Sequence, residues 1–69
     1  MEREIINKVD YLQIVAVKND DKIKRYEISP LESDGFYRNS EDTVEHNTVY
    51  FPGSWGLEKI LSDIRRVKE

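Results

Sequence analysis

The sequence contains no cysteine, one histidine and only three glycines. Without cysteine there is no disulfide and no thiolate metal site, a composition that suits a reducing cytoplasm. There is also no glycine-rich phosphate loop and no nucleophile-elbow pattern. No apolar run is as long as a membrane span, and the mixed charge of the first four residues differs from the basic start of a signal peptide. We therefore expect a cytoplasmic, non-enzymatic protein without cofactor or metal.

The chain is short, and we treat residues 1–69 as a single domain. A domain of this size buries a small core, so its stability is marginal. Because no disulfide or metal reinforces the fold, association of two copies is a source of additional buried area, and we expect a homodimer. The length, the content of Lys, Asn, Asp and Ile, and the lack of catalytic motifs are compatible with a small accessory protein of a bacterium or phage.

The first half of the chain has the pattern of a β-hairpin. Residues 11–17 are rich in β-branched and aromatic residues, and apolar residues occur at both odd and even positions. This pattern indicates a strand covered on both faces. A turn at 19–21 leads into a second arm, 22–28, whose imperfect alternation indicates a β-bulge near Lys24 and Arg25. The basic residues of this arm are also typical of an edge strand, since such charges discourage aggregation.

Further short strands are expected on either side of the hairpin. Residues 2–9 fit a short helix or a strand, and we favour the strand. A strand is also expected at 36–38, within a turn-rich region. Residues 43–45 and 48–51 are strand-like, and the pair 46–47 between them is either a tight turn or a polar pair within a strand.

The C-terminal segment predicts an amphipathic helix. Its apolar residues follow one stripe of a 3.6-residue period: Leu57, Ile60, Leu61, Ile64 and Val67. Ser54 is the expected N-cap, and Arg65 and Arg66 are expected in the last turns, where the helix dipole favours cations. The predicted fold class is therefore α+β, a small antiparallel sheet of three to five strands with one C-terminal amphipathic helix packed on one face.

Trp55 precedes this helix and has two interpretations. Its indole either fixes the start of the helix against the sheet or forms an exposed anchor in an interface. The adjacent Gly53 and Gly56 allow the backbone to approach closely, which favours the packed interpretation.

Charge is unevenly distributed, although the net charge is only −3. The segment 27–54 contains six acidic residues and one base, Arg38. Basic residues flank it on both sides: Lys22, Lys24 and Arg25 before, and Arg65, Arg66 and Lys68 after. This distribution predicts a partner protein with a basic surface, bound by electrostatic steering.

The main functional hypothesis is a small protein-binding module. Its acidic surface would imitate nucleic-acid phosphates and inhibit a nucleic-acid-binding protein, with a few apolar contacts for specificity. The expected partner-binding residues are Glu27, Glu32, Asp34, Phe36, Tyr37, Glu41, Asp42 and Glu45.

Three alternatives remain open. The two basic groups predict direct, salt-sensitive binding of nucleic acid, although an acidic chain makes this less favoured. A structural subunit of a larger assembly is the second alternative. Glu41, Asp42, Glu45 and His46 have ligand atoms suited to a metal, but their spacing matches no metal-binding loop, and a solvated loop is the simpler interpretation.

Overall fold

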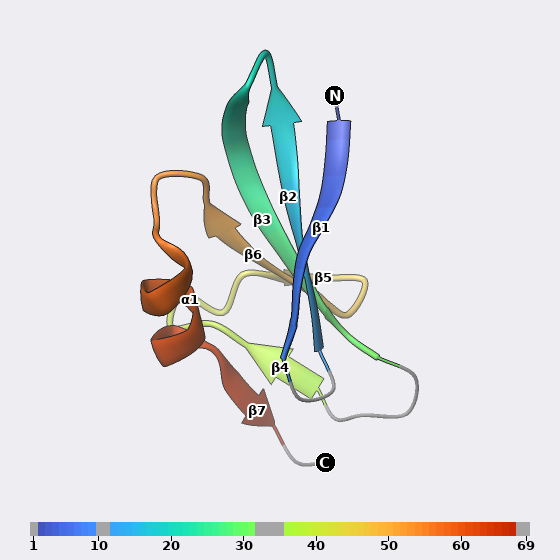
Figure 1. Ribbon diagram of the computed structural model, residues 1–69. Coiled ribbons are helices and arrows are strands. Elements are labelled where there is room, and N and C mark those ends of the chain that lie inside the picture. The colour runs from blue at the N-terminus through green and yellow to red at the C-terminus, as the bar shows by residue number, and fades with distance from the viewer. Residues whose placement is uncertain (1, 10–11, 32–35, 68–69) are drawn as a thin grey trace.

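The computed structural model describes residues 2–9, 12–31 and 36–67 as a mostly antiparallel α+β fold (Figure 1). The elements are β1 Glu2–Val9, β2 Leu12–Asn19, β3 Lys22–Pro30, β4 Phe36–Arg38, β5 Val44–Glu45, β6 Thr48–Pro52, α1 Leu57–Asp63 and β7 Arg65–Val67. Five strands form one sheet in the order β1-β2-β3-β6-β5, and β4 pairs with β7 in a second, two-stranded sheet. The α+β class and the antiparallel sheet are thus as predicted.

The hairpin of β2 and β3 confirms several predictions. Residues 2–9 form a strand, and the β2–β3 turn places Asp20 and Asp21 at φ of 50° and 65°, the left-handed region that a two-residue hairpin turn requires. Val17 lies opposite Arg25 while Lys18 lies opposite Ile23, so Lys24 is the extra residue of the predicted bulge. The edge-strand prediction for 22–28 is wrong, because Arg25 to Ile28 pair with β6 on their other side.

The second hairpin resolves the alternative at residues 46–47. His46 and Asn47 form a tight turn with φ of 50° and 61°, between β5 and β6. Both of these residues tolerate the left-handed region better than β-branched residues do. The strand at 36–38 is also confirmed, as β4.

The C-terminal helix is shorter than its apolar stripe predicts. It ends at Asp63, and Ile64 is extended, with ψ of 137°. The next residues form β7, where Arg66 lies opposite Tyr37 of β4. Two further predictions are therefore wrong: Gly56, not Ser54, is the N-cap, and Arg65 and Arg66 are outside the helix. Backbone pairing with β4 replaces the last helical turns.

One buried cluster joins both sheets and the helix. Its members are Leu12, Ile14, Ala16, Tyr26, Ile28, Tyr37, Val49, Phe51 and Ile60. Ile60 is the one buried residue of the helix. Trp55 packs against this cluster, with its ring centroid 5.4 Å from that of Phe51. The packed interpretation of Trp55 is therefore the one the structure supports.

The strand register separates the residues of the five-stranded sheet into two faces. Cross-strand partners share a face, so Ile5, Val15, Glu27 and Tyr50 lie in one row. Arg3, Val17 and Arg25 form the adjacent row. Neither row contributes to the core cluster. We call these seven residues the second face.

Candidate functional site

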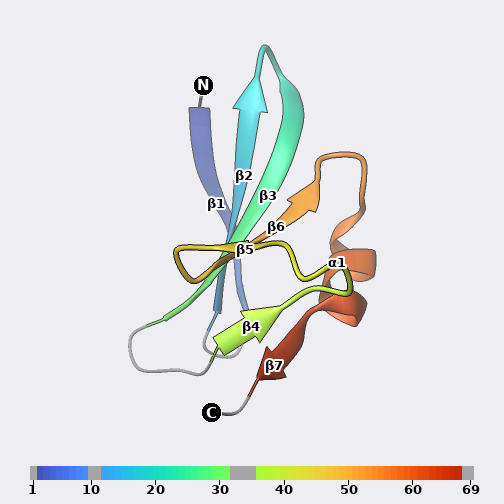
Figure 2. The same cartoon turned by 180° about the vertical axis from the view of Figure 1, so that it is seen from behind.

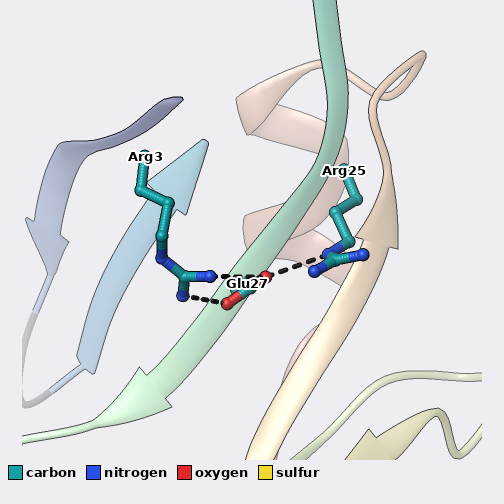
Figure 3. A network of polar contacts seen from close by, with 3 residues as sticks. All are labelled: Arg3, Arg25 and Glu27. Atoms are coloured by element: carbon teal, nitrogen blue, oxygen red, sulfur yellow. Dashed lines mark hydrogen bonds and ion pairs between the residues drawn. The ribbon is translucent and has the colours of Figure 1, made fainter. Parts of the chain in front are cut away.

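The second face is organised around Glu27, a buried carboxylate held by two arginines (Figure 3). The side chain of Glu27 is only 8% exposed. Arg3 donates from Nη1 to Oε2 at 3.3 Å and from Nη2 to Oε1, and Arg25 donates from Nε to Oε2 at 2.9 Å. Charge-assisted bonds of this kind make the burial of a carboxylate tolerable.

Arg3 reaches Glu27 across an intervening strand. Arg3 is in β1 and Glu27 in β3, and β2 lies between them. The guanidinium therefore passes over the part of β2 that carries Val15 and Val17, which are 8% and 1% exposed although neither belongs to the core cluster. We infer that the Arg3 side chain covers these valines while its charge is paired, as long basic side chains commonly do.

The two arginines keep Glu27 ionised. Burial raises the pKa of Glu27, but the hydrogen bonds and charges of Arg25 and Arg3 outweigh burial, so its pKa is below the ordinary value. One carboxylate faces two guanidinium groups, which leaves this part of the second face with an excess of one positive charge. Arg3 and Arg25 remain 58% and 40% exposed at their side chains.

An aromatic ring and an exposed isoleucine complete this face. The Arg25 guanidinium lies over the ring of Tyr50, 5.6 Å from its centroid. Ile5 lies in the same row as Tyr50 and is 55% exposed. Ile6, the extra residue at a bulge of β1, is 39% exposed. Within the described part of the chain, these two isoleucines are the exposed large hydrophobic residues.

The predicted acidic surface is only partly presented to solvent. Glu27 is buried and paired, and Tyr37 is buried in the core cluster, so neither is free to contact a partner. Phe36 is half-buried in β4. Glu32 and Asp34 lie outside the described residues. The exposed members are Glu41, Asp42 and Glu45.

A polar scaffold holds the loop that carries Glu41 and Asp42. The Asn39 side chain is the centre: its Oδ1 accepts the backbone N–H groups of Glu41 and Thr43, at 3.0 and 2.9 Å, and its Nδ2 donates to the Tyr50 carbonyl at 2.6 Å. The Asp42 carboxylate forms an ion pair with the Arg38 guanidinium, with 3.0 Å between Oδ1 and Nη1. The Asn39 bonds thus connect the loop backbone to β6.

The same loop is tied to the end of the helix. Asp63 accepts hydrogen bonds from the backbone N–H and the hydroxyl of Ser40, both at 3.0 Å. The backbone bond is the main reason that the pKa of Asp63 is lowered. This contact joins the loop to α1, 23 residues further along the chain.

The predicted basic groups are not brought together. Lys22, Lys24 and Arg25 lie at the start of β3, near the hairpin tip, whereas Arg65 and Arg66 lie in β7. Both views place the hairpin tip and β7 at opposite ends of the molecule (Figures 1 and 2). The structure instead brings Arg3 to Arg25 through Glu27. Sequence reasoning missed this pairing because the two arginines are in different strands with no local signal.

No group of three or more histidine, aspartate or glutamate side chains in the described residues is placed to hold a metal ion. His46 is 89% exposed at its side chain and lies 3.6 Å from the Glu45 carboxylate. Among the helices within the described ranges, none is long and apolar enough to cross a membrane. Comparison of the chain with protein-family models, curated proteins and solved structures finds no match.

Proposed function

We propose that this chain is a non-enzymatic protein-binding module that binds through the second face and the adjoining strand β1. The observation that carries the proposal is the position of exposed Ile5 beside the Arg3–Glu27–Arg25 network. Arginine and tyrosine beside apolar groups are the residues that dominate binding energy at protein interfaces. Glu27 holds both arginines in place, which reduces the entropy lost when a partner binds.

The same proposal includes the position of the helix and the cellular compartment. The helix is taken to cover the core face of the sheet, which leaves the second face for the partner; burial of Ile60 in the core cluster supports this. The cytoplasm is taken as the compartment, on the absence of cysteine.

The test is affinity capture from lysate, with and without nuclease treatment, that also contains an untagged copy of the chain. The tagged wild type is compared with Ile5→Lys and with Ser62→Lys, which adds the same charge at an exposed position of the helix. We expect a captured protein that Ile5→Lys loses and Ser62→Lys retains. Identical captured proteins for all three baits would contradict the proposal, and capture that disappears with nuclease would favour the nucleic-acid alternative.

A second candidate function is supported by the fixed loop of Glu41 and Asp42. We infer that these residues, with Glu45, form the acidic surface that imitates phosphates and inhibits a basic nucleic-acid-binding partner. Support comes from the Asn39 and Asp63 hydrogen bonds, which hold the loop in one conformation.

The triple variant Glu41→Lys, Asp42→Lys, Glu45→Lys tests this candidate. We expect it to lose a basic partner while its circular dichroism spectrum is unchanged, because all three side chains are exposed. Retention of the same partner by the triple variant would rule out the acidic surface. Loss with this variant but not with Ile5→Lys would favour the acidic surface over the second face.

A further inference from the structure

Strand β1 is attached to the sheet less firmly than β2 and β3 are. It pairs with β2 on one side and with no other described strand. The side chains of residues 2–6 are all exposed, and none of them belongs to the core cluster. The pairing is also interrupted, because Ile6 is an extra residue between the pairs Ile5–Val15 and Asn7–Ile14. A strand held in this way lacks the apolar burial on which sheets depend for stability.

Two ion pairs supplement the backbone pairing of β1. On the second face, Arg3 reaches across β2 to Glu27 (Figure 3). On the opposite face, Lys18 of β2 donates to the Glu4 carboxylate at 2.6 Å. Adjacent residues of a strand point to opposite faces, so Arg3 and Glu4 attach β1 to the sheet from both sides. Arg3 and Glu4 are each 58% exposed at their side chains, and ion pairs with such exposed partners stabilise a fold only modestly.

The rest of the domain does not depend on the described side chains of β1. The core cluster draws its members from β2, β3, β4, β6 and α1. Strand β3 is paired on both sides, with β2 and with β6. Separation of β1 from β2 would therefore leave this cluster intact. On the second face it would uncover Val15 and Val17, which are buried on the part of β2 that Arg3 crosses.

We propose that β1 is a detachable strand, which opens from β2 as a unit while the rest of the domain stays folded. The ion pair of Arg3 with Glu27 limits how often it opens. Local opening of this kind is typical of elements with few buried apolar contacts. The open form loses Arg3 and Ile5 from the second face and exposes Val15, Val17 and the backbone edge of β2. One side of the sheet thus alternates between two different surfaces. Opening requires no partner, so this inference is independent of the proposed function.

Native-state hydrogen exchange, followed residue by residue in NMR spectra, tests the opening. Relative to the rates of an unfolded chain, we expect the β1 amides bonded to β2 to exchange at least about tenfold faster than the amides of residues 26–28 in β3. Urea below the unfolding transition should accelerate exchange in β1 less than in β3, because local opening exposes less surface than global unfolding. Equal protection and equal urea dependence in the two strands, or no protection in β1, would overturn the proposal.

Two variants separate the opening of β1 from unfolding of the whole domain. Arg3→Met retains an unbranched side chain over the valines but removes the charge, and we expect exchange in β1 to be at least about threefold faster. Ile60→Val removes one methyl group from the core cluster, which should accelerate exchange in β3 by about two- to tenfold. Exchange in β1 should not change in Ile60→Val, because Ile60 stays packed when β1 opens.

Arg38→Met is the control for loss of an arginine, since it removes the exposed ion pair with Asp42 at a distance from β1. Exchange in β1 should stay at the wild-type rate in this variant. Acceleration of β1 by Ile60→Val to the same extent as β3 would show that β1 opens only with the whole domain, and would overturn the proposal. Equal β1 exchange in Arg3→Met and Arg38→Met would overturn the role of the Arg3–Glu27 ion pair.

Discussion

Glu27 shows how a single residue can link three strands. Its carboxylate binds Arg3 of β1 and Arg25 of its own strand, and its row continues to Tyr50 of β6. We expect Glu27→Gln to lower the free energy of unfolding by about 1–2 kcal/mol, because hydrogen bonds to charged groups are lost and the arginines remain partly solvated. Urea unfolding at about pH 7 measures this change, with exposed Glu41→Gln as the control, expected within about 0.5 kcal/mol.

The difference in unfolding free energy between the wild type and Glu27→Gln should depend on pH, and the direction of that dependence follows from the pKa of Glu27. The pKa of Glu27 is lower in the folded state than its ordinary value of 4.5. Its contribution to stability is therefore fully present above that value and is lost as the pH falls through the folded-state pKa. The stability gap between the wild type and Glu27→Gln should shrink as the pH falls below the ordinary value of 4.5 and through the lower folded-state pKa of Glu27. A constant gap over this interval would show that ionisation of Glu27 does not stabilise the fold.

Gly53 is required by the space around it rather than by its backbone angle. A Cβ at Gly53 would lie 1.9 Å from the Ile23 carbonyl oxygen. The backbone N–H of Gly53 donates to the Lys24 carbonyl at 3.3 Å. Gly53→Ala must displace the bulged backbone of β3, and we expect a loss of about 1–3 kcal/mol. At Gly56 a Cβ would meet nothing within 4 Å, so Gly56→Ala is the matched control. Equal thermal melting of the two variants would contradict this account.

At the scale of elements, sequence patterns predicted strands better than they predicted the helix. The hairpins are encoded locally, by β-branched arms and by Asn and Asp at the turns. The end of the helix is not. The apolar stripe continues through Ile64 and Val67, but backbone pairing with β4, nearly thirty residues earlier, converts residues 65–67 into a strand. Periodicity cannot report a pairing between segments so far apart, and tertiary contacts override helix propensity in this way.

The β2–β3 turn offers a prediction that follows from backbone angles alone. Asp20 and Asp21 both have positive φ, and the sequence that suits such a turn best is Asn-Gly. The double variant Asp20→Asn, Asp21→Gly should raise the free energy of unfolding by about 1 kcal/mol, because the left-handed region is strained for other residues. Thermal melting followed by circular dichroism measures it. Asp20→Val should have the opposite effect, since β-branched residues resist positive φ.

For the whole molecule, the distribution of charge along the sequence predicted only in part which acidic residues are exposed. Counting acids from Glu27 to Glu45 treats them as one surface, but strand register places Glu27 on the second face and leaves it paired. The loop residues Glu41 and Asp42 are exposed as expected. Arg3 was not predicted to contribute, because its partner is 24 residues away and the order of strands decides their contact. Exposure is thus a property of the assembled sheet.

The two sheets and the helix depend on one shared core, and Ile60 tests whether they unfold together. Ile60 is fully buried, and Tyr37 joins the same cluster from the two-stranded sheet. Ile60→Ala should cost about 2–5 kcal/mol. A single core of this size rarely supplies more than about 3–5 kcal/mol, so we expect Ile60→Ala to unfold in one transition at a clearly lower temperature than the wild type.

Leu61 is half-buried in the same helix, and Leu61→Ala is the control, with a smaller expected loss. Native-state hydrogen exchange of both variants distinguishes two cases. If the domain is one cooperative unit, protection of the β2 and β3 amides falls in Ile60→Ala together with that of β4 and β7. If the β2 and β3 amides keep their wild-type protection while those of β4 and β7 exchange freely, the five-stranded sheet is stable without the helix, and the shared core does not make the domain cooperative.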